Sequence, residues 1–191
     1  MRTQAFVSAL VVLAALGLVA PARGDELTVP VDLQVQLVSR IARYERTFAA
    51  HASEPATIVV VARSRNPESQ RVAAQLVAAL SRTAQIGGRP VRVLRHEFTS
   101  AAALVAELDR THATIMYAAP GLSGDMDAIA HALSGHALIT ISAVGRDVDH
   151  GVVLSFDLVS SRAQIVINLG RARSQQLQFS AQLLRLARVV Q

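Results

Sequence analysis

The sequence predicts an α/β protein, a three-layer α/β/α sandwich with a mostly parallel sheet and a C-terminal antiparallel hairpin at the edge. Short runs of β-branched and other apolar residues recur along the chain, as in strands that are buried on both faces. Stretches with helical spacing separate the first four runs, which favours parallel pairing through right-handed crossovers. Only Ser160 and Ser161 separate the last two runs, and so short a connection permits only an antiparallel hairpin.

Residues 1–24 have the layout of a cleavable signal peptide. Arg2 precedes an uncharged apolar run over 5–20, and the small residues Ala22 and Gly24 follow it. We expect cleavage near Gly24, with Ala22 as an alternative site. The run is shorter than the roughly 20 residues that a membrane-spanning helix needs, although a retained N-terminal anchor is the other interpretation.

Residues 25–191 are expected to form a single domain that is exported to the periplasm. The chain has no cysteine, so the domain folds without disulfides and has no thiol chemistry. Removing Arg2 and Arg23 reduces the 19 basic residues to 17, against 14 acidic residues, and the net charge from +5 to +3. This weak positive charge and the few aromatic residues argue against nucleic-acid binding. We also expect no membrane insertion after signal cleavage.

The first half of the domain shows two helical patterns around a buried strand. The first pattern predicts a helix over 32–50, and the apolar run over 57–63 predicts a strand buried on both faces. Asn66 and Pro67 then fit the cap and first position of a second helix. The expected buried face of the first helix is Leu33, Leu37, Ile41, Tyr44 and Phe48, and that of the second is Val72, Leu76, Ala79 and Leu80.

The alternation continues through the middle of the chain. A turn over 86–90 leads to a half-buried strand over 91–97, and Ser100 fits the cap of the next helix. Buried strands are predicted over 113–119 and 137–143. They flank the loop 120–125 and a short helix over 126–135, and the loop 145–151 follows the second of them.

The last part of the chain is predicted to dock its C-terminus onto the sheet. After the hairpin, Asn168 fits a helix cap, and Leu177 and Phe179 alternate as in an extended segment. Ser180 fits the cap of a final helix over 181–190. Its expected buried stripe is Leu183, Leu184, Ala187 and Val190. Arg185 and Arg188 lie off this stripe, whereas Arg171 and Arg173 are interpreted as residues of a solvated turn.

Ligands of open α/β sheets bind outside the carboxyl ends of the parallel strands. In this sequence those ends are followed by the loops 64–68, 120–125 and 145–151. We therefore expect partner or ligand contacts there and at the two arginines after the last long strand. The candidate residues are Ser64, Arg65, Asn66, Leu122, Ser123, Arg146, Asp147, Asp149, His150, Arg171 and Arg173.

No motif of the sequence calls for catalysis, a cofactor or a metal ion. The stretch around Ser123 has Asp125 where a nucleophile elbow needs its closing glycine, so Ser123 is interpreted as a turn or cap residue. No glycine-rich nucleotide-binding motif follows a strand. Asp147, Asp149 and His150 could form a weak metal site, but a solvated loop with turn-forming aspartates is the favoured interpretation.

The stretch over 151–190 resembles the closing motif of the YfiR-like periplasmic protein family. The motif combines a glycine, two strands, a short helical segment and a leucine-rich end. Its matching positions are Gly151, Phe156, Ile167, Asn168, Leu177, Ser180, Leu183, Leu184, Leu186, Ala187 and Val189. The chain has no tryptophan and therefore lacks the F-x-x-W-P signature of many members, which indicates a divergent branch.

The resemblance implies a periplasmic regulator without a catalytic site. Its partner would be an inner-membrane signalling protein, a diguanylate cyclase or sensor kinase, and its output cyclic-di-GMP or related signalling. Homodimerisation is expected on the same ground. The alternatives are a small-ligand-binding accessory protein of an envelope uptake system and, less favoured, an unrecognised hydrolase.

Overall fold

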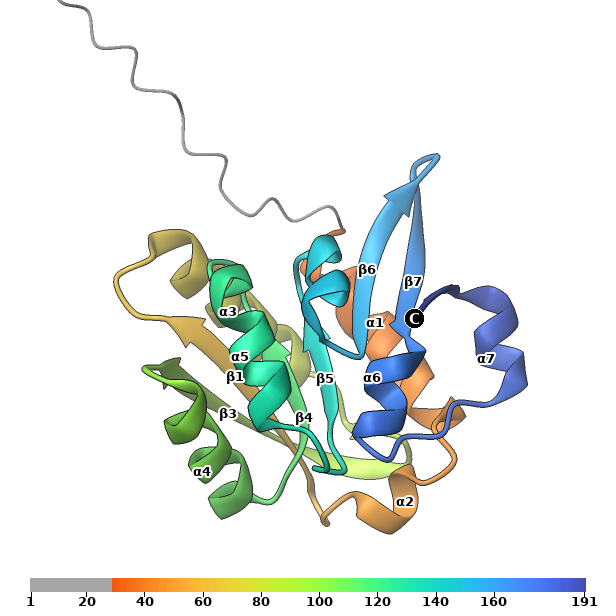
Figure 1. Cartoon of the computed structure of the whole chain (residues 1–191), viewed down its shortest axis with the longest axis horizontal. Coiled ribbons are helices and arrows are strands. Elements are labelled where there is room, and N and C mark those ends of the chain that lie inside the picture. Colours follow the sequence, from red (N-terminus) through yellow and green to blue (C-terminus); the bar gives the residue numbers. More distant parts are fainter. Residues whose placement is uncertain (1–28) are drawn as a thin grey trace, which may run out of the picture.

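A computed structural model describes residues 29–191, so the signal peptide predicted over 1–24 lies outside the described residues. One sheet has the strand order β2-β3-β1-β4-β5-β6-β7-β8 (Figure 1). Its strands are β1 (Ala56–Arg63), β2 (Gln85–Ile86), β3 (Arg89–Phe98), β4 (Ala113–Ala118), β5 (Ile139–Ser142), β6 (Leu154–Val159), β7 (Arg162–Asn168) and β8 (Arg188–Val190). The pairs β3–β1, β1–β4, β4–β5, β5–β6 and β7–β8 are parallel, and β2–β3 and β6–β7 are antiparallel.

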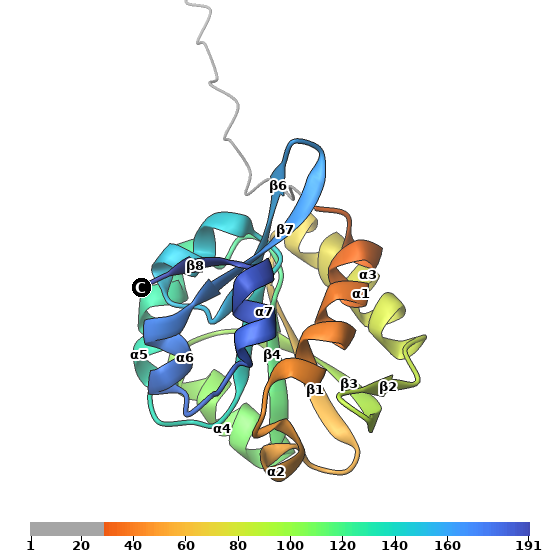
Figure 2. The ribbon, with the colours of Figure 1, turned by 90° about the vertical axis from the view of Figure 1, so that its right-hand side faces the viewer.

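Helices cover both faces of the sheet, which confirms the predicted three-layer fold (Figures 1 and 2). The α-helices are α1 (Val31–Ile41), α2 (Phe48–His51), α3 (Pro67–Ser81), α4 (Ala101–Thr111), α5 (Met126–Ala132), α6 (Leu169–Ser174) and α7 (Ala181–Leu186). Short 3₁₀ helices are η1 (Ala42–Tyr44), η2 (Ser123–Asp125) and η3 (Gly145–His150). Within residues 29–191, no helix is both long and apolar enough to cross a membrane.

Two buried clusters lie on opposite faces of β1, because successive side chains of a strand point to opposite faces. Ile58 and Val60 pack with the residues of α1 and α3, whereas Val59 and Val61 pack with those of α4 and α5. All four of these β1 side chains are fully buried. The prediction of a strand buried on both faces is therefore confirmed.

The predicted helix caps are also confirmed. The side chain of Asn66 accepts a hydrogen bond from the Ser69 amide at the start of α3, and Ser100 accepts one from Ala103 at the start of α4. Asn168 and Ser180 act in the same way at the starts of α6 and α7. Each cap satisfies an amide that the first turn of a helix leaves unpaired.

The predicted continuous helix over 32–50 is wrong, because the chain leaves the helical conformation at Glu45. This residue has an extended backbone (φ −86°, ψ 114°), and its buried carboxylate accepts hydrogen bonds from Thr47 and from the amide of Gln178. A bridge between Glu45 and Phe179 fixes the break. The C-terminal segment thus binds where a continuous helix would otherwise pass.

The buried face of α1 also differs from the predicted one. Ile41 is buried as predicted, but Leu33 is 37% exposed, and Gln34, Val35 and Val38 are buried instead. The reason is a polar contact from a distant strand. Tyr117 of β4 donates a hydrogen bond to the amide oxygen of Gln34 (2.6 Å), and the Gln34 amide donates to the Val29 carbonyl (2.7 Å). Complete burial raises the pKa of Tyr117 well above its ordinary value, since the ionised phenol would be unsolvated.

The final helix is shorter than predicted and is followed by a strand. Helix α7 ends at Leu186, and β8 pairs in parallel with β7, with Ile167 opposite Val189. The helical stripe predicted through Ala187 and Val190 is therefore wrong beyond Leu186. Two consecutive valines favour the extended conformation, and β8 pairs with the otherwise free edge of β7. The sheet thus extends one short strand beyond the hairpin.

Candidate functional site

The loops predicted to carry the site lie together at the carboxyl edge of the sheet. Strands β1, β4, β5 and β6 run parallel, so the segments that follow them emerge at the same edge. The hairpin of β6 and β7 projects from this edge beyond the body of the molecule (Figures 1 and 2). We call the exposed parts of these loops and the hairpin tip the carboxyl-edge surface.

Asp147 joins two of the loops from a fully buried position. One carboxylate oxygen accepts a hydrogen bond from Ser123 and the other accepts one from Ser142, both at 2.5 Å. Ser142 also accepts a hydrogen bond from the amide of Val144 (3.1 Å). The interpretation of this loop as solvated is therefore wrong for Asp147, because a buried carboxylate needs hydrogen-bond donors and here finds two hydroxyls.

Arg63, at the end of β1, ties the first loop to the second. Its guanidinium donates to the carbonyl of Gly121 (2.6 Å) and forms an ion pair with Asp125. The same group lies 5.4 Å from the ring centroid of Phe98. Ser64 and Arg65, predicted as contact residues, are exposed at the turn just beyond.

Two other predicted contact residues of this region support the fold, one as a helix cap and one in the core. Asn66 caps α3, and its amide lies so near Gly121 that a Cβ there would be 2.5 Å from the amide nitrogen. Leu122 is fully buried in the cluster beneath α4 and α5. The side chain of Leu122 thus lies in the core and does not reach the carboxyl-edge surface.

A shallow cavity of about 350 Å³ lies beside Gly151 and gathers residues of the helices α5, η3 and α6 and of the end of β7. Its lining is Asp127, Asp149, His150, Gly151, Asn168, Gly170, Arg171 and Ser174. The structure thus brings together Asp149, His150 and Arg171 of the predicted set. His150 Nδ1 lies 3.7 Å from a carboxylate oxygen of Asp127, and both side chains are largely exposed.

Arg171 is a structural residue of this cavity, so its interpretation as part of a solvated turn is wrong. Its guanidinium donates a hydrogen bond to the carbonyl of Ala130 in α5 (2.7 Å), and its amide donates to Asn168 (2.8 Å). Asn168 in turn donates to the carbonyl of Val148 (3.0 Å). These bonds hold α6, α5 and η3 together. Arg173, by contrast, is exposed.

The tip of the hairpin is part of the surface that the sequence analysis missed. Leu158 and Val159 are 46% and 49% exposed, directly before the turn at Ser160 and Ser161. Both serines have positive φ (49° and 60°), as tight hairpin turns require. The sequence signal for this exposed tip was the position of two large apolar residues directly before the hairpin turn.

The carboxyl-edge surface combines exposed polar side chains in the loops with two exposed apolar ones, Leu158 and Val159, at the hairpin tip. Among residues 29–191, no group of three or more histidine and acidic residues is arranged to hold a metal ion. The hydroxyl of Ser123 is hydrogen-bonded to Asp147.

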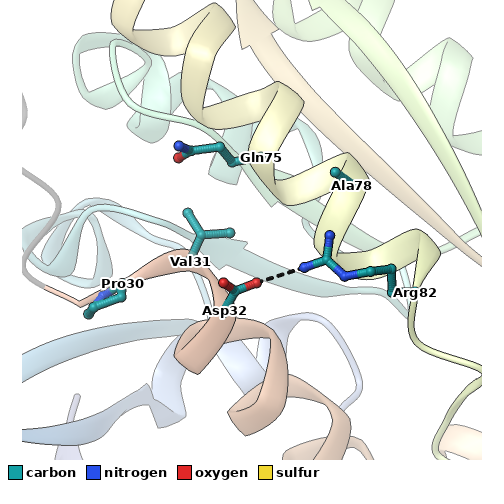
Figure 3. Close-up of a pocket in the computed structure, with 6 residues that line it drawn as sticks. All are labelled: Pro30, Val31, Asp32, Gln75, Ala78 and Arg82. Atoms are coloured by element: carbon teal, nitrogen blue, oxygen red, sulfur yellow. Dashed lines mark hydrogen bonds and ion pairs between the residues drawn. The ribbon is translucent and has the colours of Figure 1, made fainter.

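A second cavity of about 440 Å³ lies between the start of α1 and α3 (Figure 3). Asp32 and Arg82 form an ion pair across it at 3.0 Å, while Gln75 and Ala78 line the α3 side. Its charges are mutually neutralised, and none of the predicted contact residues lines it.

Solved structures confirm the fold class. The chain matches the structure of an ABC domain in complex with L-Trp from Streptococcus pneumoniae with a TM-score of 0.58 and 13% identity, over 84% of this chain and 62% of that one. It matches a conserved domain protein from Vibrio cholerae O1 biovar El Tor with a TM-score of 0.55 and 12% identity, over 85% of this chain and 60% of that one. The chain thus spans about three fifths of either structure, and at these identities the likeness concerns the fold alone.

The family is shown by a match over nearly the whole described domain. A comparison with curated proteins finds no match. The sequence profile of the YfiR/HmsC-like family, however, matches residues 31–188, from the first residue of α1 to the first residue of β8. This range includes the cavity beside Gly151, the projecting hairpin and most of the closing motif. The chain therefore belongs to the YfiR/HmsC-like family.

Proposed function

We propose that this chain is a non-enzymatic periplasmic regulator that binds the periplasmic part of an inner-membrane signalling protein. That partner is a diguanylate cyclase or sensor kinase, and binding modulates cyclic-di-GMP or related signalling. The observation that carries the proposal is the family match over residues 31–188, because the YfiR-like family is known for periplasmic regulators of diguanylate cyclases. The apolar stretch within 1–24, with its signal-peptide layout, supports export.

The carboxyl-edge surface is the contact region that we assign to the partner. Leu158 and Val159 supply exposed apolar side chains at the projecting hairpin tip, and the exposed predicted residues of the loops supply polar ones. Specific protein interfaces usually combine apolar and polar contacts. The exposed predicted residues of these loops are Ser64, Arg65, Arg146, Asp149 and His150, whereas Arg173 is exposed on α6, outside this surface.

The test compares Leu158→Asp with Leu186→Asp in a host strain that lacks the native gene. Leu186 is 68% exposed on α7, away from the carboxyl edge, and is the matched control. We expect deletion to raise cellular cyclic-di-GMP, and we expect the wild-type chain and Leu186→Asp to restore the low level. Leu158→Asp should fail to restore it, since placing a charge at an apolar contact costs tenfold or more in affinity.

The same strains provide the contradicting outcome. If deletion leaves cyclic-di-GMP unchanged and a transported small molecule raises the melting temperature of the purified protein, the uptake-accessory function replaces this proposal. Because homodimerisation is proposed for this chain as well, the oligomeric state of both variants is measured by sedimentation. A dimer that Leu158→Asp alone dissociates would assign the hairpin tip to self-association instead.

A further inference from the structure

A third cavity, of about 370 Å³, lies between α1 and the end of α3. Its lining is Val35, Gln36, Ser39, Arg40, Arg43 and Thr83. The cavity by Gly151 and the cavity of Figure 3 both contain carboxylates, but no acidic residue lines this one. Its volume falls at the lower end of the range of small-molecule sites, roughly 300–1,000 Å³.

The charge of this cavity comes from two arginines, Arg40 and Arg43. Arg40 and Arg43 are exposed, and neither forms an ion pair with any residue in the described part of the chain. Arg82, next to the cavity residue Thr83, is by contrast neutralised by Asp32. Other arginines that pair with a carboxylate are Arg63, Arg71, Arg89, Arg95, Arg110 and Arg188.

The sequence spacing accounts for the convergence of the two arginines. They stand three positions apart across the junction of α1 and η1, and residues three apart in a helix lie on the same side. The helix dipole favours a cation in the last turn of α1, but this effect does not require two guanidinium groups to line one cavity. Two cations in one cavity without an acidic residue favour the binding of an anion.

We propose that this cavity binds the phosphate group of a small hydroxylated molecule, such as a polyol phosphate. Two guanidinium groups carry a charge of +2, which a phosphate monoester balances and a single carboxylate does not. Planar guanidinium groups also match phosphate oxygens with paired hydrogen bonds. The side-chain amide of Gln36 is a further donor on the same wall.

The remaining lining residues indicate what the phosphate is attached to. Ser39 donates its hydroxyl hydrogen to the Val35 carbonyl (3.0 Å), and Thr83 donates to the Ala79 carbonyl (3.3 Å). Their oxygens therefore remain as acceptors and suit hydroxyl donors on the ligand. The cavity is also larger than a phosphate ion needs. No residue of this cavity belongs to the carboxyl-edge surface, so this proposal and the proposed function can fail independently.

The test is calorimetric titration of the purified protein with glycerol 3-phosphate, alongside inorganic phosphate and phosphatidylglycerol vesicles. We expect saturable binding of a phosphate-bearing probe. The double variant Arg40→Gln/Arg43→Gln should weaken this binding at least tenfold, because it removes two charge-assisted contacts. Arg46→Gln is the matched control, since Arg46 is an exposed arginine of the same region that does not line the cavity.

The arms of the experiment separate the sources of phosphate. Binding of glycerol 3-phosphate identifies a soluble ligand, whereas binding of vesicles alone identifies a lipid headgroup. Either one supports the site if the double variant loses it and Arg46→Gln keeps it. Absence of binding to every probe overturns the proposal, as does equal weakening by both variants. Binding of an acidic peptide such as polyglutamate without phosphate binding overturns it too.

Discussion

Asp147 determines the shape of the carboxyl edge through a single carboxylate. Ser123 belongs to the segment after β4 and Ser142 to the end of β5, so the two hydrogen bonds fix one loop relative to the next strand. Hydrogen bonds from two hydroxyls offset the cost of burying the carboxylate. Asp149, two residues later, is exposed and carries none of this role.

Replacing Asp147 with alanine should therefore destabilise the protein, whereas replacing Asp149 should not. We expect Asp147→Ala to lower the free energy of unfolding by about 2–4 kcal/mol, because it removes the acceptor of the buried Ser142 hydroxyl and the hydrogen bond from Ser123. Asp149→Ala should stay within about 0.5 kcal/mol. Urea denaturation followed by circular dichroism measures both. Equal effects would show that the Asp147 hydrogen bonds are not what holds the loops.

Single residues were predictable where their partner lies within one helical turn. The cap residues Asn66, Ser100, Asn168 and Ser180 bond an amide three positions along the chain, so local sequence contains both partners. Gln34 and Asp147 were not predictable in this way. Gln34 is buried because Tyr117, 83 positions away, bonds it, and only the folded topology brings the two together.

At the scale of elements, the junction of η3 and β6 packs tightly on α5. Gly151 has a φ of 98°, and a Cβ at this position would lie 2.6 Å from the Cβ of Ala130. Arg171 closes the contact from α6 through its bond to the Ala130 carbonyl. The cavity beside Gly151 keeps its shape only if α5, α6 and the junction of η3 and β6 stay in contact.

The comparison of Gly151→Ala with Gly135→Ala separates this contact from backbone strain. Gly135 also has a positive φ (86°), but a Cβ there would meet nothing within 4 Å. We expect Gly135→Ala to cost about 1–2 kcal/mol from strain alone. Gly151→Ala should cost about 2–4 kcal/mol, since the clash with Ala130 adds to the strain. Thermal unfolding measures both, and equal losses would contradict a tight junction.

The strands and helices of the central fold were predictable, whereas the two ends were not. The apolar run of β1 and the face of α3 are encoded locally by periodicity. The break at Glu45 and the formation of β8 both depend on where the C-terminal segment lies in the fold. Phe179 of this segment bridges Glu45, and the chain then continues through α7 to β8. The projecting tip at Leu158 was missed because apolar residues in a strand are ordinarily assigned to the core.

At the scale of the whole molecule, the sheet is shared by both cores. Leu76 of α3 packs on one face and Leu104 of α4 on the other, and both side chains are fully buried. Strand β1 contributes alternate residues to each cluster and pairs with both β3 and β4. Losing either layer of helices would expose one face of the same central strands to water.

We therefore expect the two layers to unfold together as one cooperative unit. Leu76→Ala and Leu104→Ala should each lower the free energy of unfolding by about 2–5 kcal/mol, through lost burial and the cavity left behind. Each variant should still show a single transition, with coincident curves from far-ultraviolet and near-ultraviolet circular dichroism. A variant in which one transition splits into two would show that the layer carrying that leucine folds separately. The cooperative unit matters for function, because the carboxyl-edge surface takes residues from elements packed on both faces of the sheet.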